Sequence, residues 1–357
     1  MGKIATTQLI LGALLFLISI PTAIPAQEPL CGPERDALID RLINYLGFDT
    51  SHRHSLVHRG EIIHTALPDL EKTPEDLAVA GVMLIIRRPM TEVVEVFLDD
   101  ESFRKGHEVN QHGVIPEEAT RAQIEAAFSQ VGFTGEEQAE VKKILHAKPG
   151  PHLNLSRKEY SRLQAINPRD PQATEKVSSV YRDILIERSK SFDDRGITGI
   201  EPYDRKRNKI TSPARELTAA IDGMQFLVEH FPSFSAALRH SPQPQVADIG
   251  HQDFWIKKSL DKRPLYVLSH RLVLTRDSYA LAADLQYFVG HSYNSMLTII
   301  GAVKCQENTL VVAVNHTFTD QVTGIGGGIK KKVGRKKVAE NLARHFKALR
   351  TSVESRN

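Results

Sequence analysis

The spacing of apolar residues changes near Pro264. Upstream of it, apolar residues mostly recur every three or four positions, which is typical of amphipathic helices; downstream they recur every second position, which is typical of strands. Because the alternating runs follow one another with short breaks, they predict four sequential strands in an antiparallel meander. The predicted strands cover residues 265–275, 278–291, 295–304 and 309–318.

After the meander the period returns to that of a helix. Residues 336–353 predict a long amphipathic helix, because their apolar side chains recur every three or four positions. The stripe consists of Val338, Leu342, Phe346, Leu349 and Val353.

A glycine cluster, Gly324, Gly326 and Gly328, lies between the last strand and this helix. The spacing matches neither the G-x-x-x-x-G-K-[ST] nor the G-x-G-x-x-G pattern of nucleotide-binding loops. We therefore expect these glycines to act as a hinge that lets the helix cross the sheet.

The first half of the chain carries one strand–helix unit and a long helical region. A β-branched apolar run over residues 77–88 predicts a strand, and Pro89 opens an amphipathic helix that includes Val93 and Leu98. Residues 32–46 predict a helix and residues 60–67 a short strand. Further helices are expected between residues 111 and 240. Their start signals are Thr134 with Glu137, Ser156 with Glu159, and Ser212 before Pro213.

The N-terminus has the pattern of a secretory signal peptide. Lys3 precedes a short apolar core, and small residues end at Ala26. The alternative is an uncleaved anchor, although the core is short and Pro21 interrupts it. We expect export to a secreted or periplasmic location. In an oxidising compartment Cys31 and Cys305 could form a disulfide, or each could be an isolated buried thiol.

Charge is unevenly distributed along the chain. The formal net charge is +3, yet residues 329–357 hold ten basic and two acidic residues. This tail suits an anionic membrane surface or is the solvated face of a helix. The candidate contacts are Lys330, Lys331, Lys332, Arg335, Lys336 and Lys337. We expect no nucleic acid as a partner.

The chain holds 15 histidines. His52, His54, His58 and His64 fit no standard zinc spacing, and we expect them in a polar surface loop. His270, His291 and His316 instead fall on the apolar side of separate strands, where an unpaired imidazole is costly. They are either satisfied core residues, liners of a cavity, or catalytic or metal-binding groups. Strand register argues against one shared metal, and we expect no metal site and no cofactor.

Serine chemistry has weak support in the sequence. No G-x-S-x-G motif occurs, and Ser292 beside His291 would point to the opposite side of a strand. Asp320 lies an even number of positions after His316, so both are expected on the same side of the chain. Asp320 either orients that histidine or caps the glycine turn. No catalytic residue is assigned.

The stretch "AVAGVMLIIRRPMTEVVEVFLDDESF" resembles the opening of START-like, or helix-grip, domains, in which a strand runs into a helix that begins "xxPxxxVxxxLxD". The resemblance covers roughly residues 75–105 and 245–353, and it continues in the meander and the glycine-started last helix. It implies a curved sheet gripped by that helix around an apolar cavity for lipids, sterols or polyketides, with no catalytic residues to carry over.

We therefore expect an α+β protein in which a long C-terminal helix covers an antiparallel meander, with a large helical insertion. The expected function is non-catalytic binding or carriage of an apolar small molecule or lipid. Alternatives are a secreted hydrolase or metal-dependent enzyme that uses the inward histidines, and an envelope scaffold without ligand. The expected cavity liners are His270, Tyr279, Tyr287, His291, His316 and Phe346. The expected parts are a signal peptide at 1–26, a helix with the first strand–helix unit at 27–110, the helical insertion at 111–240, and the sheet with its gripping helix at 241–357.

Overall fold

The computed structural model describes residues 30–67, 76–98, 109–117, 119–242, 246–320 and 327–356. The expected signal peptide at 1–26, together with Gly324 and Gly326, lies outside these residues. Among the described helices, none combines the length and the hydropathy needed to cross a bilayer.

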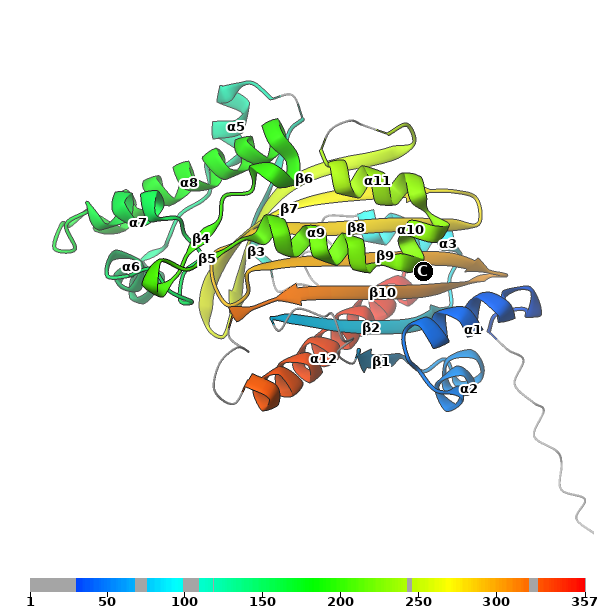
Figure 1. Cartoon of the computed structure of the whole chain (residues 1–357). Coiled ribbons are helices and arrows are strands. Elements are labelled where there is room, and N and C mark those ends of the chain that lie inside the picture. Colours follow the sequence, from blue (N-terminus) through cyan, green and yellow to red (C-terminus); the bar gives the residue numbers. More distant parts are fainter. Residues whose placement is uncertain are drawn as a thin grey trace, which may run out of the picture.

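The predicted meander is present, and it belongs to an eight-stranded antiparallel sheet (Figure 1). The strands lie in the spatial order β1-β2-β10-β9-β8-β7-β6-β3. Their bounds are Ile63–Ala66 for β1, Leu77–Ile86 for β2, Val109–Ile115 for β3, Ile249–Leu260 for β6, Arg263–Thr275 for β7, Tyr279–Val289 for β8, Ser295–Cys305 for β9 and Asn308–Phe318 for β10. The sequence patterns did not predict β3 and β6.

The first long strand, β2, pairs with the last strand, β10, over ten residues. Leu84 lies opposite Val311, and Ile85 lies opposite Leu310. Because side chains alternate along a strand, this register sends Leu84 and Val311 to one face of the sheet and Ile85 and Leu310 to the other. All four side chains are buried, so β2 and β10 are covered on both faces.

Helix α12 (Gly327–Glu354) packs across β2 and β1, and α3 (Met90–Leu98) lies on the same face. We call this side the grip face. Phe346 of α12 is fully buried there beside Val82 and Val311. Glu354 at the far end of α12 accepts a hydrogen bond from the backbone N–H of Arg87 at 2.9 Å. The predicted gripping helix is therefore confirmed.

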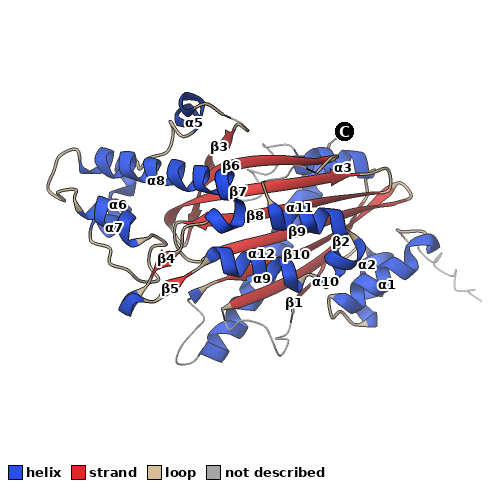
Figure 2. Cartoon of the chain, turned by 45° about the horizontal axis from the view of Figure 1, so that its top comes forward, coloured by secondary structure: helices blue, strands red, loops and turns tan. Residues whose placement is uncertain are grey.

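The opposite side, which we call the insertion face, is covered by the helices between β3 and β6 (Figure 2). The predicted helix starts at Ser156 and Ser212 are confirmed, since both side chains accept a hydrogen bond from a first-turn N–H. The helices are α5 (Arg121–Ala127), α6 (Gln138–Leu145), α7 (Arg157–Gln164), α8 (Ala173–Arg195), α9 (Pro213–Gly223), α10 (Gln225–His230) and α11 (Pro232–His240). They form the largest apolar core of the described chain with this face of the sheet.

The histidine-rich segment expected to be a loop is instead a helix, α2 (Thr50–Arg59), that follows α1 (Asp36–Tyr45). Asp49 caps its first turn by accepting hydrogen bonds from Ser51 and His52, and Gly60 ends it with a φ of 63°. The loop prediction was wrong because polar composition hid the two apolar anchors, Leu56 and Val57, which are buried.

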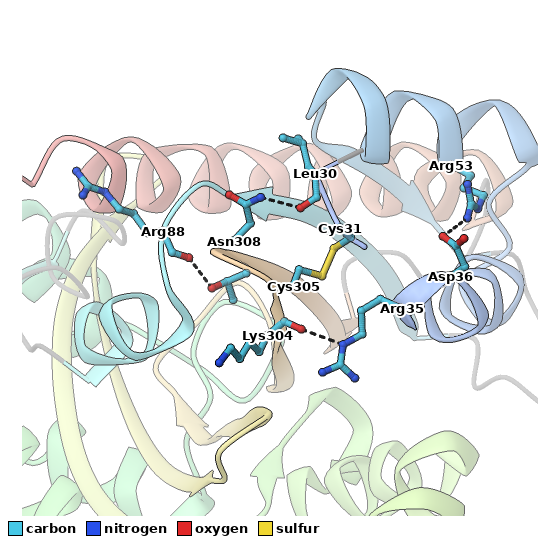
Figure 3. Close-up of a disulfide and its surroundings, with 10 residues drawn as sticks. Leu30, Cys31, Arg35, Asp36, Arg53, Arg88, Lys304, Cys305 and Asn308 are labelled. Carbon is cyan, nitrogen blue, oxygen red and sulfur yellow. Dashed lines mark hydrogen bonds and ion pairs between the residues drawn. A yellow bond between two sulfur atoms is a disulfide. The ribbon is translucent and has the colours of Figure 1, made fainter. Parts of the chain in front are cut away.

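Cys31 and Cys305 form a disulfide across 274 residues of sequence. Figure 3 shows how the segment before α1 lies against the turn between β9 and β10 at this bond. Arg35 Nε donates to the carbonyl of Lys304 at 2.9 Å, and Asn308 Nδ2 donates to the carbonyl of Leu30 at 2.7 Å. The bond therefore fastens the N-terminal segment to the end of the meander.

Replacing both cysteines with serine should lower the free energy of unfolding by about 2–5 kcal/mol, because the bond restricts a long loop of the unfolded chain. Urea unfolding monitored by circular dichroism measures this value. Wild-type protein in reducing buffer should show the same loss. A double variant that unfolds at the wild-type urea concentration would show that the bond does not support the fold.

Candidate functional site

The six residues expected to line one cavity lie on two sides of the sheet. Strand register places His270, Tyr279 and His316 on the insertion face, and Tyr287 lies there too because it stacks on Phe192 of the insertion. His291 follows β8 in the turn to β9, and Phe346 lies on the grip face. Phe346 therefore shares no cavity with the other five. The periodicity identified an apolar face correctly, but it carried no information on which helical layer covers that face.

Aromatic and apolar side chains of the insertion fill the space over this face. Phe192 of α8 stacks on Tyr287 with ring centroids 4.2 Å apart and planes within 6°. The same ring lies 5.4 Å from His270. Tyr279 lies 5.4 Å from Phe231. Around His270, Tyr279 and Tyr287, side chains of the insertion therefore fill the space in which a cavity was expected.

His291 is a satisfied core histidine. Its Nδ1 lies 2.6 Å from Ser292 Oγ, and its Nε2 lies 3.1 Å from the carbonyl oxygen of Pro264. Burial, with the nearby charge of Arg263, lowers the pKa of His291 to about 4. The imidazole is therefore neutral at pH 7 and serves as a link between the ends of two strands.

His316 is almost fully buried in the centre of the insertion face. It lies opposite Leu297 of β9 and Val79 of β2. Its Nδ1 has no hydrogen-bond partner among the described residues. Burial alone lowers its pKa to about 4. Asp320, one of whose alternative roles was to orient this ring, instead forms an ion pair with Arg205.

His270 belongs to a chain of three polar side chains. Its Nδ1 lies 3.0 Å from Asp253 Oδ1, and its Nε2 lies 3.3 Å from His251 Nδ1. An ionised carboxylate only accepts, so with both imidazoles neutral this geometry places one proton on His270 Nδ1 and the other on His251 Nδ1. His251 Nε2 is then a bare acceptor, but the atom is buried. No group of three His, Cys, Asp or Glu side chains in the described part of the chain is arranged to hold a metal.

The grip face carries a line of polar side chains across five strands. In strand order these side chains lie directly opposite one another from β6 to β10, so they run roughly 20 Å across the sheet at about 4.8 Å per strand. We call this line the polar row. It consists of Gln252, Arg271, Asp284, Thr298 and Asn315.

Four members of the polar row are buried, with at most 9% exposure at Arg271, Asp284, Thr298 and Asn315, and Gln252 is half-buried. Arg271 forms an ion pair with Asp284 at 3.8 Å, and its guanidinium lies 4.9 Å from the ring centre of Phe254. Asn315 donates to Thr298 at 2.8 Å. Burying such groups is costly unless hydrogen bonds compensate. Ser269 Oγ donates to Asp284, and Thr317 Oγ1 donates to Asn315 at 2.7 Å, so the protein itself offsets part of that cost.

Gln286 lies two residues after Asp284 in β8, so it faces the same side of the sheet as the polar row. Its Oε1 accepts a hydrogen bond from Tyr293 at 2.7 Å. Its Nε2 is buried and has no hydrogen-bond partner among the described residues. An unsatisfied buried donor is costly, and a bound molecule with an acceptor group would relieve that cost.

A depression of about 580 Å³ lies at the β6–β7 end of the polar row. Five residues of β6 and β7 that strand register places on the grip face contribute to its wall. They are Gly250, Gln252, Arg271, Val273 and Thr275. A side chain added at Gly250 would meet only the carbonyl oxygen of Val273 at 3.8 Å, so the space above this glycine is open. The remaining lining residues are Asp248, His251 and Arg276.

Sequence reasoning missed the polar row because it followed the more apolar parity of each strand. The sequence does contain the pattern, at the alternate positions of each strand that point to the opposite face. Arg271, Asp284, Thr298 and Asn315 each interrupt an otherwise largely apolar or small series, and the short turns align them. Aligning the four predicted strands through their turns would have placed these residues in register.

The basic residues of α12 are only partly described. The side chains of Lys330, Lys331 and Lys332 lie outside the described set. Lys336 lies 3.8 Å from Glu340, and Lys337 lies 3.6 Å from Asp261 in the β6–β7 turn. These two cations are exposed and have acidic neighbours, so the tail is less uniformly basic than its sequence.

A buried polar network fastens the insertion to the ends of β9 and β10. Glu216 of α9 accepts hydrogen bonds from Ser295 Oγ at 2.6 Å and Asn294 Nδ2 at 2.9 Å. Arg205 Nη2 donates to Asn294 Oδ1 at 3.2 Å, and Arg205 Nε donates to Asp320. Burial raises the pKa of Glu216 to about 7.

No family model matches this chain, and no curated protein matches it. Among solved structures, the crystal structure of Ara h 8.0201 is similar at 13% identity and a TM-score of 0.20, over 40% of this chain and 91% of that chain. The crystal structure of the di-domain ARO/CYC StfQ from the steffimycin biosynthetic pathway is similar at 8% identity and a TM-score of 0.22, over 77% of this chain and 98% of that chain. These likenesses are weak and carry no argument about function.

The pKa of His316 predicts a pH effect on stability. Below pH 6.5 the unfolded histidine binds a proton, whereas the folded imidazole does so only near pH 4, so acidification favours unfolding in this window. In the variant His316→Gln this loss is absent. Relative to wild type, the variant should therefore gain about 1.5 kcal/mol in unfolding free energy between pH 6.5 and pH 5.

Urea unfolding at the two pH values measures that shift. The substitution His230→Gln, at an exposed histidine, is the matched control and should leave the difference constant. A constant difference for His316→Gln as well would mean that His316 is not held neutral by burial.

Proposed function

We propose that this chain is an exported, non-catalytic binding protein for an amphipathic small molecule or lipid held on the grip face. The polar row, ending in the depression at Gly250, carries this proposal. The row offers polar groups to a ligand with polar groups of its own, and beside it Gln286 Nε2 is a buried donor without a partner among the described residues.

The surroundings of the polar row favour an amphipathic ligand over a purely apolar one. Apolar side chains flank the row on the side of Phe254, Ile256 and Val267. On the other side lie Ala280 and Ala302, against Met90 of α3. A ligand with a polar segment flanked by apolar segments would match this arrangement of polar and apolar side chains. The expectation of an apolar ligand among the histidines is accordingly replaced.

Export is a proposal supported by two observations. The N-terminal sequence has the pattern of a signal peptide, and Cys31 forms a disulfide with Cys305. Disulfides persist mainly in oxidising compartments. A secreted or periplasmic location accounts for both.

The enzyme alternative rests on one observation, the Asp253–His270–His251 chain. Its terminal acceptor, His251 Nε2, is buried, and burial together with His270 lowers the pKa of His251. A general base must reach the proton it removes, so the buried atom favours binding over catalysis. A scaffold without ligand would leave the buried donor of Gln286 unexplained.

Substituting Gly250→Phe should weaken ligand binding at least tenfold, because the ring would occupy the depression without meeting the backbone. Titration with cis-parinaric acid, a fluorescent fatty acid, measures binding after the purified protein has been delipidated. Gly223→Phe, which also places a ring in open space but on α9, is the matched control and should bind as wild type does. Wild-type affinity in a folded Gly250→Phe variant would contradict the proposed site.

A further inference from the structure

A short two-stranded hairpin with several basic residues belongs to the insertion. Strand β4 (Tyr203–Asp204) pairs with β5 (Ile210–Thr211). Arg207 and Asn208 at its tip have φ values of 59° and 58°. Residues other than glycine seldom adopt this left-handed conformation, which costs of the order of 1 kcal/mol for each residue. The surrounding contacts must hold the tip in place.

The base of the hairpin is firmly anchored. Tyr203 is fully buried and donates to the carbonyl of Asn294 at 3.1 Å. Arg205 donates to Asn154 at 2.8 Å and to Asp320, and Thr211 donates to the same Asp320 carboxylate at 3.0 Å. The hairpin is therefore fixed to the body of the insertion and to the end of β10.

The hairpin exposes several cations and one apolar side chain. Lys206, Arg207 and Lys209 are exposed, and Ile210 is 65% exposed, the largest value among the exposed large hydrophobic residues of the described chain. Arg157 adds a charge beside the tip, since its Nη2 donates to Asn208 at 2.9 Å. We call these five residues the hairpin patch.

The acidic residue nearest to the hairpin patch is Asp204, in β4. It accepts a hydrogen bond from the backbone N–H of Arg157 at 2.6 Å and lies 3.6 Å from the Arg157 guanidinium. One carboxylate against four cations leaves the patch strongly positive. Ile210 pairs with Asp204 in the hairpin, and most of its side chain remains exposed to solvent.

Four cations on and beside one short hairpin that also exposes an aliphatic side chain match the chemistry of an anionic bilayer surface. The cations are attracted to the headgroups, and the aliphatic group enters the boundary with the acyl chains. A nucleic acid would also attract the cations, but base stacking calls for aromatic side chains, and the patch presents isoleucine. We propose that the hairpin patch docks the protein on an anionic lipid surface.

This docking site differs from the one expected on α12. There Lys336 and Lys337 have the acidic neighbours Glu340 and Asp261. The hairpin patch joins charge, an apolar tip and a rigid base in one place. It is independent of where a ligand binds, so the failure of either proposal leaves the other intact.

Cosedimentation with vesicles of phosphatidylglycerol and phosphatidylcholine tests the proposal. The triple variant Lys206→Gln, Arg207→Gln, Lys209→Gln should bind about 100-fold more weakly, since each basic residue near such a surface contributes about fivefold. Ile210→Ser should weaken binding several-fold at unchanged charge. The matched variant Lys336→Gln, Lys337→Gln, Lys347→Gln removes equal charge from α12 and should change binding less than threefold.

Three outcomes would overturn the proposal. One is wild-type vesicle binding by the folded hairpin triple variant. Another is a larger loss in the α12 variant than in the hairpin variant. The third is a neutral effect of Ile210→Ser together with equal binding to transfer RNA, which would assign the patch to nucleic acid. Circular dichroism should show native folding throughout, because all substituted hairpin side chains are exposed.

Discussion

The antiparallel pairing of β2 with β10 is the constraint on which the rest of the structure depends. It brings together segments more than 200 residues apart in sequence and joins the first strand–helix unit to the meander. Both strands are apolar on both faces, so each needs a covering layer on each side. One layer comes from α12, which follows β10 directly, and the other comes from the N-terminal helices and the insertion. A register slip of one residue would exchange these faces.

The two faces of the sheet differ in polarity as a consequence of this arrangement. On the insertion face the central row runs from His270 through Leu285 and Leu297 to His316, and burial keeps His316 neutral. On the grip face the central row is polar from Gln252 to Asn315. The face that looked more apolar from its sequence is thus closed by the insertion. The polar face is the one with the open depression, and the buried amide donor of Gln286 has no partner there among the described residues.

Much of the fold followed from periodicity and helix-start chemistry, because both are local. The four meander strands, the caps at Ser156 and Ser212 and the final helix needed no long-range information. The segment with Phe254, Trp255 and Ile256 in β6 escaped notice because a continuous apolar run flanked by charges has no clear alternation. The candidate site was missed for another reason. Its members lie on five strands, and only the strand register shows that Arg271, Asp284 and Thr298 are neighbours.

The most direct test of the central claim, that the ligand lies on the grip face, is a crystal structure of the protein with a brominated fatty acid. Anomalous scattering would locate the bromine without any assumption about the site. The account predicts the bromine on the grip face, in or beside the depression formed by Gly250, Val273 and Arg271. Bromine between α8 and the sheet, beside Phe192 and Tyr287, would contradict it.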